Sequence, residues 1–522
     1  AFTKAWEKSC STQGKVILEV PKRLYYVKPI KLQGPCKFNH LIFDISGTII
    51  TSKSNYNDGN SNYGLTFENV DNLIVQGGGT IDGYGLDFWW SPCKFYKFKY
   101  CLPTPRVLTF HNCNKLIVRD FSVRNAQKNY ITFTHCNNVK ASHLTLTSSE
   151  KSATGNGIYL SHTQDIEIFN SAIKTGGGYC ISIKSGTNTV KVHDIACGPG
   201  YGISIGELGS RNSEVNVTDV IVNRVKFFET LFGVRIKTIK GGSGIANNMQ
   251  FENIEMNNVQ NPIIIEQGYC DQNDKLCIKQ KLKLEIYYSK TYGIHVTHSQ
   301  DIEISNSVIG TGDDCISIVS GSKNITATDI TCGPGHGISI GSLGGGHSEA
   351  HVSDVFVRRA QFYETTNGVR IKTWQGGVGE ASNITFQDIE MHNVRNPIVI
   401  DQNYCARSTT PCQEQESAVQ VRNVLYQNIR GTSADEVAIK FDCSHSVECE
   451  GIVLEEIDLH IHSHRRSNRH NRRDGDTEAV CRNIQFTNIG HFQTFSLLFQ
   501  IFLHHENPCK LVKINHKKTD VI

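Results

Sequence analysis

The sequence predicts an all-β protein built as a right-handed parallel β-helix, a solenoid of short stacked coils. Short β-branched runs bounded by Asn, Gly and Asp begin at Lys115, Asn138 and Asp165, which are 138 − 115 = 23 and 165 − 138 = 27 residues apart. Helical periodicity is almost absent along the chain. Because one coil is too small to bury its own apolar face, stacking of neighbouring coils is expected to supply the core.

A tandem duplication supports this fold. One copy reads GGYC at 177–180 and CGPGYG at 197–202, and the other reads GDDC at 312–315 and CGPGHG at 332–337. The offset is 315 − 180 = 135 positions, and it still holds for the Arg-Ile-Lys strings, since 370 − 235 = 135. A β-sandwich also uses many short strands and is the main alternative, but a duplication without change in loop length favours the solenoid.

The chain is expected to have three regions. Residues 1–285 form an N-terminal β-helix part that includes the degenerate first copy, residues 286–490 form the second copy, and residues 491–522 form a divergent C-terminal tail. No Gly/Ser or Pro linker separates the two copies at residues 279–292. The copies are therefore expected to stack as one elongated β-helix.

The N-terminal residues predict a short capping helix. Phe2, Ala5, Trp6 and Ser9 follow near-helical spacing within residues 1–10. The open end of a solenoid presents an apolar coil, which a helix of this kind would cover.

Composition excludes several classes of partner. Charged residues are 20% of the chain, and Lys plus Arg exceeds Asp plus Glu by 53 − 50 = 3. No global charge for binding a polyanion is present, so nucleic acid is not expected as a partner and an acidic ligand would need a local cluster. No apolar run reaches the roughly 18 to 20 residues that span a bilayer, so no membrane association is expected. The chain is expected to be a monomer.

The cysteines predict disulfides and an oxidising compartment. Among the 18 cysteines, pairs recur at matched spacings in the two copies. The predicted bridges are Cys180–Cys197, Cys315–Cys332, Cys270–Cys277, Cys405–Cys412 and Cys443–Cys449. They imply a secreted, extracellular protein. Buried free thiols are the alternative, and zinc is less favoured because no finger-like spacing is present.

The second copy carries a set of residues suited to hydrolysis of a glycosidic bond. Asp313 and Asp314 are adjacent, so one could protonate the leaving oxygen while the other activates water. Arg370 and Lys372, two apart on a strand, project to one face and could hold a carboxylate of the substrate. His336, between two glycines, could hydrogen-bond the acid. Each element alone is also typical of a turn or a solvated strand face, and their order and spacing make the combination specific.

With these motifs the sequence resembles the polygalacturonase family of inverting, pectin-degrading glycoside hydrolases, particularly its plant members. The matching motifs are TGDDC at 311–315, CGPGHGISIGS at 332–342, RIK at 370–372 and, earlier, GGGTIDG at 77–83. The resemblance implies a right-handed parallel β-helix that hydrolyses α-1,4-linked galacturonan in the cell wall without a metal or other cofactor.

Roles follow from the resemblance position by position. Asp313 would be the general acid, Asp314 a carboxylate that activates water, and His336 a residue that supports the acid. Arg370, Lys372 and Tyr404 would bind galacturonate near the scissile bond.

The sequence departs from the family at one catalytic position. Family members carry a third Asp in an Asn-Thr-Asp-Gly motif, where this chain has Tyr292 in the second copy and Asn156 in the first. Loss of that carboxylate predicts a rate lower by on the order of 10² to 10⁴, the usual effect of one general acid or base. The first copy keeps Arg235, Lys237 and Tyr269 and is expected to be non-catalytic but able to hold an acidic sugar.

Two other functions stay open from the sequence. A degenerate β-helix protein that binds galacturonan without turnover would explain Tyr292 and Asn156. A calcium-dependent pectate lyase on a similar solenoid would need clustered acidic ligands, and Asp313 with Asp314 is too few.

Overall fold

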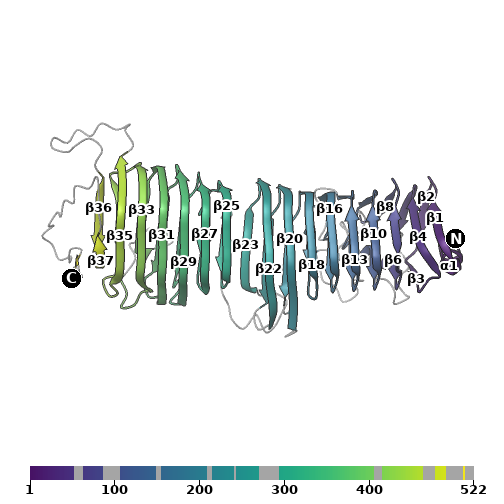
Figure 1. The fold of residues 1–522 in the computed structure, drawn as a ribbon, viewed down its shortest axis with the longest axis horizontal. Helices are drawn as coiled ribbons and strands as arrows, with labels where there is room; N and C mark the ends of the chain where they lie inside the picture. The colour runs from purple at the N-terminus through teal and green to yellow at the C-terminus, as the bar shows by residue number, and fades with distance from the viewer. Residues whose placement is uncertain are drawn as a thin grey trace, which may run out of the picture. The chain divides into compact units, whose positions relative to one another are not determined.

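The structure is a computed structural model that describes residues 1–51, 63–85, 106–148, 155–208, 214–239, 243–269, 293–404, 414–461, 477–489 and 510–511. These residues belong to two compact units, the first formed by 1–264 with 268–281 and the second by 265–267 with 282–522. In each unit, strands of successive coils pair in parallel (Figure 1).

The first unit begins with a helix and continues in two parallel sheets. Its elements are α1 (Phe2–Ser11), β1 (Gly14–Val20), β2 (Leu24–Val27), β3 (Ile30–Gln33), β4 (Phe38–Ile45), β5 (Thr48–Thr51), β6 (Tyr63–Glu68), β7 (Leu73–Gln76), β8 (Thr80–Asp82), β9 (Arg106–His111), β10 (Asn114–Arg119), β11 (Ser122–Arg124), β12 (Ile131–Thr134), β13 (Asn137–Ser142), β14 (Thr145–Thr147), β15 (Ile158–Ser161), β16 (Gln164–Lys174), β17 (Ile181–Ile183), β18 (Asn188–Cys197), β19 (Ile203–Leu208), β20 (Glu214–Phe228), β21 (Phe232–Ile239) and β22 (Ser243–Asn257). One sheet runs β3-β6-β9-β12-β15-β17-β19-β21, and the other contains β1, β4, β7, β10, β13, β16, β18, β20 and β22 with the shorter strands β2, β5, β8, β11 and β14. The residues of β23 (Asn261–Tyr269) are divided between the two units.

The second unit has the same construction. Its strands are β24 (Ile294–Thr297), β25 (Gln300–Ile309), β26 (Ile316–Ile318), β27 (Ser322–Cys332), β28 (Ile338–Leu343), β29 (Glu349–Tyr363), β30 (Asn367–Trp374), β31 (Val378–Val394), β32 (Asn396–Tyr404), β33 (Gln420–Ser433), β34 (Val437–Asp442), β35 (Cys449–Ile461), β36 (Glu478–Arg482), β37 (Ile484–Ile489) and β38 (Lys510–Leu511). One sheet runs β24-β26-β28-β30-β32-β34-β36, and the other runs β25-β27-β29-β31-β33-β35-β37-β38. The predicted fold class, all-β with a parallel β-helix, is confirmed.

The core is a set of ladders in which one coil repeats the side chain of the next. Phe67, Phe110 and Phe133 stack in line, with ring centroids 5.4 and 5.2 Å apart and planes tilted by 8° and 11°. All three are fully buried. Since alternate residues of a strand face opposite sides, the β-branched runs bury one face and leave the other for solvent or ligands. Each coil thus needs its neighbours to bury its apolar surface.

The backbone repeats the duplication seen in the sequence. Asp194 and Asp329 lie 329 − 194 = 135 positions apart and both bend a long strand with φ of 56°. Asp219 and Asp354, at the same offset, have φ of 58° and 59°. A left-handed conformation is accessible to Asp and Asn because their short polar side chains can hydrogen-bond locally. The corners of the coils are therefore fixed by equivalent residues in both units.

The N-terminal helix caps the first unit as predicted. Trp6 is 3% exposed, its ring lies 5.5 Å from that of Phe67, and its Nε1 donates to the carbonyl oxygen of Gln33 at 3.0 Å. A disulfide between Cys10 and Cys36, which the sequence did not predict, ties the helix to the first coils. Within the described ranges, no helix combines the length and the apolar character that crossing a membrane requires.

Three of the predicted disulfides are confirmed. Cys180–Cys197, Cys315–Cys332 and Cys443–Cys449 are bonded. The predicted bridges Cys270–Cys277 and Cys405–Cys412 lie outside the described residues, as do Tyr292 and the join at 279–292. Cys113 and Cys136 are buried free thiols, the alternative reading of the cysteines. The boundaries of the three regions and the single elongated stack stay predictions.

Candidate active site

The predicted site residues of the second unit come from four successive coils. Asp313 and Asp314 precede β26, His336 precedes β28, Arg370 and Lys372 lie in β30, and Tyr404 ends β32. The parallel register aligns Ser317 with Ser339 and Ser339 with Arg370, so outward side chains of neighbouring strands stand side by side. Direct contacts link these site residues into one cluster, described below.

Asp314 is held in a fixed ion pair. Its carboxylate is fully buried, and Lys372 Nζ lies 2.9 Å from Oδ2. Ser339 donates from Oγ to Oδ1 at 2.8 Å. A buried carboxylate needs such partners, because leaving one uncompensated is strongly unfavourable. The pair fixes the orientation of both side chains without any ligand.

Asp313 is joined to the histidine. The residue is 4% exposed, and its Oδ1 accepts the backbone N–H of Asp314 at 2.9 Å. The same oxygen lies 3.1 Å from His336 Nδ1. His336 itself keeps about a third of its side chain exposed. The Asp313 carboxylate is therefore positioned by the protein, while the histidine beside it remains open to solvent.

Glycines and a disulfide keep the His336 turn in place. Gly337 has φ of 85°, and a Cβ built on it would overlap the carbonyl oxygens of Asn367 and Gly368. The Cys315–Cys332 bridge joins the coil of the two aspartates to the coil that leads into this turn. Gly337 is thus required by the close approach of backbone from the next coil.

Arg370 and Tyr404 complete the cluster. The Arg370 guanidinium lies 5.1 Å from the centre of the Tyr404 ring, and Lys372 Nζ lies 5.6 Å from it. Asp401 Oδ2 accepts a hydrogen bond from Arg370 at 2.9 Å. Trp374 packs its ring edge to face with Tyr404 at 5.3 Å. The Tyr404 ring thus lies beside two cationic side chains, each of which is also paired with a carboxylate of the protein.

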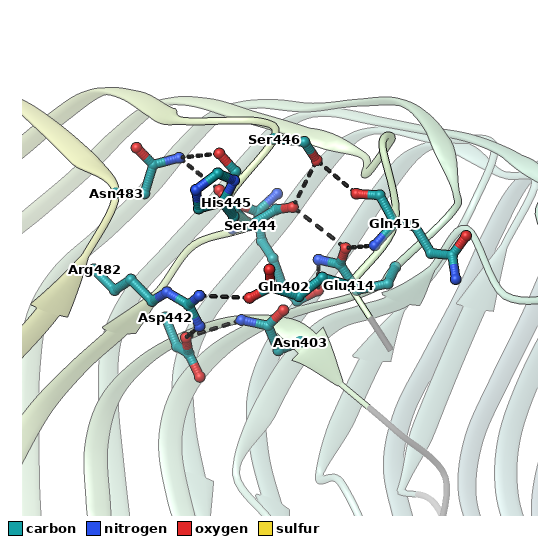
Figure 2. A network of polar contacts seen from close by, with 11 residues as sticks. Gln402, Asn403, Glu414, Gln415, Asp442, Ser444, His445, Ser446, Arg482 and Asn483 are labelled. Atoms are coloured by element: carbon teal, nitrogen blue, oxygen red, sulfur yellow. Dashed lines mark hydrogen bonds and ion pairs between the residues drawn. The ribbon is translucent and has the colours of Figure 1, made fainter. Parts of the chain in front are cut away.

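A polar network fixes the end of the strand that carries Tyr404 (Figure 2). Gln402 is fully buried, and its Oε1 accepts the backbone N–H of Ser444 at 2.9 Å. Asn403 donates from Nδ2 to Asp442 Oδ1 at 2.9 Å. Tyr404 follows directly in the chain, so these bonds hold its strand in position.

Three of the residues that support the cluster were missed from the sequence. Ser339, Asp401 and Trp374 contact Asp314, Arg370 and Tyr404 respectively. The two-residue alternation of side chains along β28, β30 and β32 could have indicated them, because each occupies an outward position next to a predicted site residue. Which of them touch depends on register between coils, which the local sequence does not give.

Asp313, Asp314 and His336 are also residue types that can ligate a metal ion. One ligand atom each of Asp313, Asp314 and His336 lies within 4.8 Å of the others. Lys372 already neutralises Asp314, so a divalent ion would have to displace that ammonium. The expected absence of a metal stays a prediction.

A parallel β-helix that presents two adjacent carboxylates beside basic side chains has the equipment of a glycoside hydrolase. Sequence comparison gives the class more narrowly: the chain belongs to glycosyl hydrolases family 28, whose profile matches residues 10–288 and again residues 287–485. The resemblance to polygalacturonases is thereby confirmed.

Relatives span most of the chain. A polygalacturonase of Malus domestica is 38% identical over 462 residues, which cover 88% of this chain and 70% of the relative. Polygalacturonase-2 of Solanum lycopersicum is 37% identical over 494 residues, covering 94% of this chain and 75% of the relative. Among solved structures, the family 28 exopolygalacturonase of Yersinia enterocolitica matches with a TM-score of 0.43 and 12% identity, over 86% of this chain and 73% of that one.

Proposed function

We propose that the chain hydrolyses α-1,4-galacturonosyl linkages of pectin or polygalacturonate, with the active site in the second unit. The observation that carries the proposal is that the predicted acid residues and the predicted substrate-binding residues are in contact. Lys372 pairs with the buried carboxylate of Asp314, and Lys372 and Arg370 both face the Tyr404 ring. Membership of family 28 and the polygalacturonase relatives support the substrate class.

Each side chain has a role in this mechanism. Asp313 donates a proton to the glycosidic oxygen, and His336, 3.1 Å away, supports its carboxyl group during the transfer. Asp314 takes a proton from the attacking water, which enters from the face opposite the leaving group. Arg370 and Lys372 bind the galacturonate carboxylate, and Tyr404 packs against the sugar ring.

The third carboxylate that the resemblance implies is replaced in both copies. In the first unit Asn156 stands where the family has this aspartate. The Asn156 side chain has a structural contact there, since its Oδ1 accepts the backbone N–H of Tyr179 at 3.1 Å. Tyr292 stands at the position in the second copy, outside the described residues. This replacement supports an alternative, a galacturonan-binding protein without turnover.

Release of reducing ends from polygalacturonate, by the full chain and by Asp313→Asn, decides between the two. We expect activity in the parent and a loss of about 10² to 10⁴ in the variant, the usual effect of one general acid. Binding without any release of reducing ends by the parent would select the alternative. The anomeric configuration of the first product, followed by NMR, tests the inverting course that the family implies.

We further propose that the protein is secreted and acts outside the cell, in the wall. Its disulfides support this location, since such bonds persist in oxidising compartments. Recovery of disulfide-bonded protein from the wall fraction of cells that express the gene would test it. Recovery only from inside the cells would contradict it.

A further inference from the structure

The first unit carries a different cluster at the positions of the active site. Tyr179 stands at the position of Asp314, since 314 − 135 = 179, and Tyr201 stands at the position of His336, since 336 − 135 = 201. The basic pair is kept as Arg235 and Lys237 in β21. The register aligns Ser204 with Arg235, as it aligns Ser339 with Arg370 in the second unit.

Three aromatic rings gather at this place. The centroids of Tyr179 and Tyr201 are 5.7 Å apart with planes at 80°, and Phe232 lies 6.4 Å from each. All three side chains are half-buried, so part of each ring faces solvent. Rings presented in this way pack well against the C–H faces of a sugar.

The two cations lie against these rings. The Arg235 guanidinium is 4.6 Å from the centre of Phe232 and donates from Nη1 to the Tyr179 hydroxyl at 3.5 Å. Lys237 Nζ lies 5.6 Å from the centre of Tyr179. Lys237 is only 3% exposed, and its stem runs past Gly206, where a Cβ would overlap its Cγ. These cation–π contacts hold the Arg235 and Lys237 side chains beside the three rings.

The first unit has no room for the catalytic acid. Gly178 stands at the position of Asp313, since 313 − 135 = 178. A Cβ built on Gly178 would overlap the backbone carbonyl oxygen of Gly155. With Gly178 and Tyr179 in place of the two aspartates, the cluster lacks the proton donor and the base that cleavage needs.

We propose that the cluster of Tyr179, Tyr201, Phe232, Arg235 and Lys237 binds a uronate residue of an acidic polysaccharide and does not cleave it. The cations pair with the sugar carboxylate, and the rings pack on the pyranose faces. The choice of galacturonate as that uronate rests on the proposed function. Because both sites would be on one chain, a polymer held by the first unit raises the effective concentration of substrate at the second.

Calorimetric titration tests the proposal with trigalacturonate and the full chain carrying Asp313→Asn, which prevents consumption of the ligand. We expect two binding sites per chain. Adding Arg235→Gln should remove one of them or weaken it at least about tenfold, the loss expected for one charge-assisted contact. Adding Arg370→Gln instead should remove the other. Maltotriose, which has no carboxylate, should bind at neither.

Arg224→Gln is the matched control, because it removes an exposed arginine from the same unit and should leave both sites intact. Melting curves check folding, and if Arg235→Gln melts lower than its parent, Tyr201→Ala takes its place. An unchanged two-site titration in folded Arg235→Gln or Tyr201→Ala would overturn the proposal, as would equal binding of maltotriose. If the parent releases no reducing ends but the arginine-dependent first site remains, the proposed hydrolysis fails and this inference stands.

Discussion

The two units share a frame, made of the coil corners and the buried core, and differ in a small set of outward side chains. The disulfides Cys180–Cys197 and Cys315–Cys332 have the same Cα–Cα distance of 5.9 Å. The ion pairs Arg224–Asp194 and Arg359–Asp329 lie at equivalent positions, with distances of 2.7 and 2.6 Å. Aspartates and a histidine in the second unit are replaced by tyrosines and a glycine in the first. Because corners and core fix the coil, outward side chains can change without altering the fold.

The equivalent lysines Lys237 and Lys372 have different neighbours in the two units. Lys372 contacts the buried carboxylate of Asp314 at 2.9 Å, whereas Lys237 lies over the ring of Tyr179, which occupies the equivalent position. A carboxylate takes part in proton transfer, and a ring only contributes a polarised face. The residue at this one position therefore distinguishes the proposed catalytic site from the proposed binding site.

The largest effect is expected from restoring the third carboxylate. Tyr292→Asp should raise kcat by on the order of 10² to 10⁴, the usual contribution of one general acid or base. Initial rates on polygalacturonate measure it. Asn156→Asp is the matched control, because the first unit lacks the other two acids, and it should leave the rate unchanged. If the parent releases reducing ends, an unchanged rate in Tyr292→Asp would show that Asp313 and Asp314 suffice.

Removing the buried counter-ion should destabilise the second unit. Lys372→Met leaves Asp314 buried without its ion pair, which costs about 3 to 5 kcal/mol of unfolding free energy. Urea denaturation measures this loss. Lys440→Met, which removes a half-exposed lysine from the same sheet, should change stability little. Equal stability of the two variants would mean that the Lys372 pair contributes no more than a surface contact.

Placing an acid in the first unit should cost stability without creating activity. Gly178→Asp forces a side chain against the Gly155 carbonyl, for an expected loss of about 1 to 3 kcal/mol from overpacking. Gly78→Asp is the control in the same unit, since a Cβ there meets no atom within 4 Å. A Gly178→Asp protein as stable as the control would contradict the view that backbone closes this position.

Asp401 is expected to act by positioning Arg370. In Asp401→Asn the guanidinium loses its charged partner at 2.9 Å, so KM should rise about tenfold while kcat changes less. Steady-state kinetics on oligogalacturonates separate the two constants. A fall in kcat with KM unchanged would instead place Asp401 in the chemical step.

The smallest expected effect is a loss of thermal stability on removing an exposed ion pair, and it should be equal in the two units. Hydrogen bonds from Arg224 and Arg359 lower the pKa of Asp194 and Asp329 respectively. A lowered folded pKa gives stability that is present above the ordinary carboxylate pKa of about 4 and is lost as the pH falls through the folded value. Arg224→Gln and Arg359→Gln should therefore lower Tm slightly and equally at pH 6, and the difference from the parent should shrink at pH 3. Unequal changes in Tm at pH 6 would contradict the equivalence of these coil corners in the two units.

The sequence by itself determined the class of fold, the duplication, the capping helix and six residues of the candidate site, but not the residues that support them. These features depend on local patterns: a coil-length repeat of β-branched runs, Asn and Asp at corners, and motifs such as GDDC at 312–315. The Cys180–Cys197 and Cys315–Cys332 bridges were predictable for the same reason, since each spans 17 residues at matched spacing.

Only the tertiary structure decided which side chains meet across coils. Lys372 reaches Asp314 over 58 positions of sequence, and Cys10 reaches Cys36 because the helix folds back on the first coils. The closed position at Gly178 likewise depends on the carbonyl of Gly155 in the preceding coil. Register between stacked coils sets the contacts of Lys372 and Gly178, and docking of the helix sets the Cys10–Cys36 bridge. Both follow from the packing of whole coils rather than from any short stretch of residues.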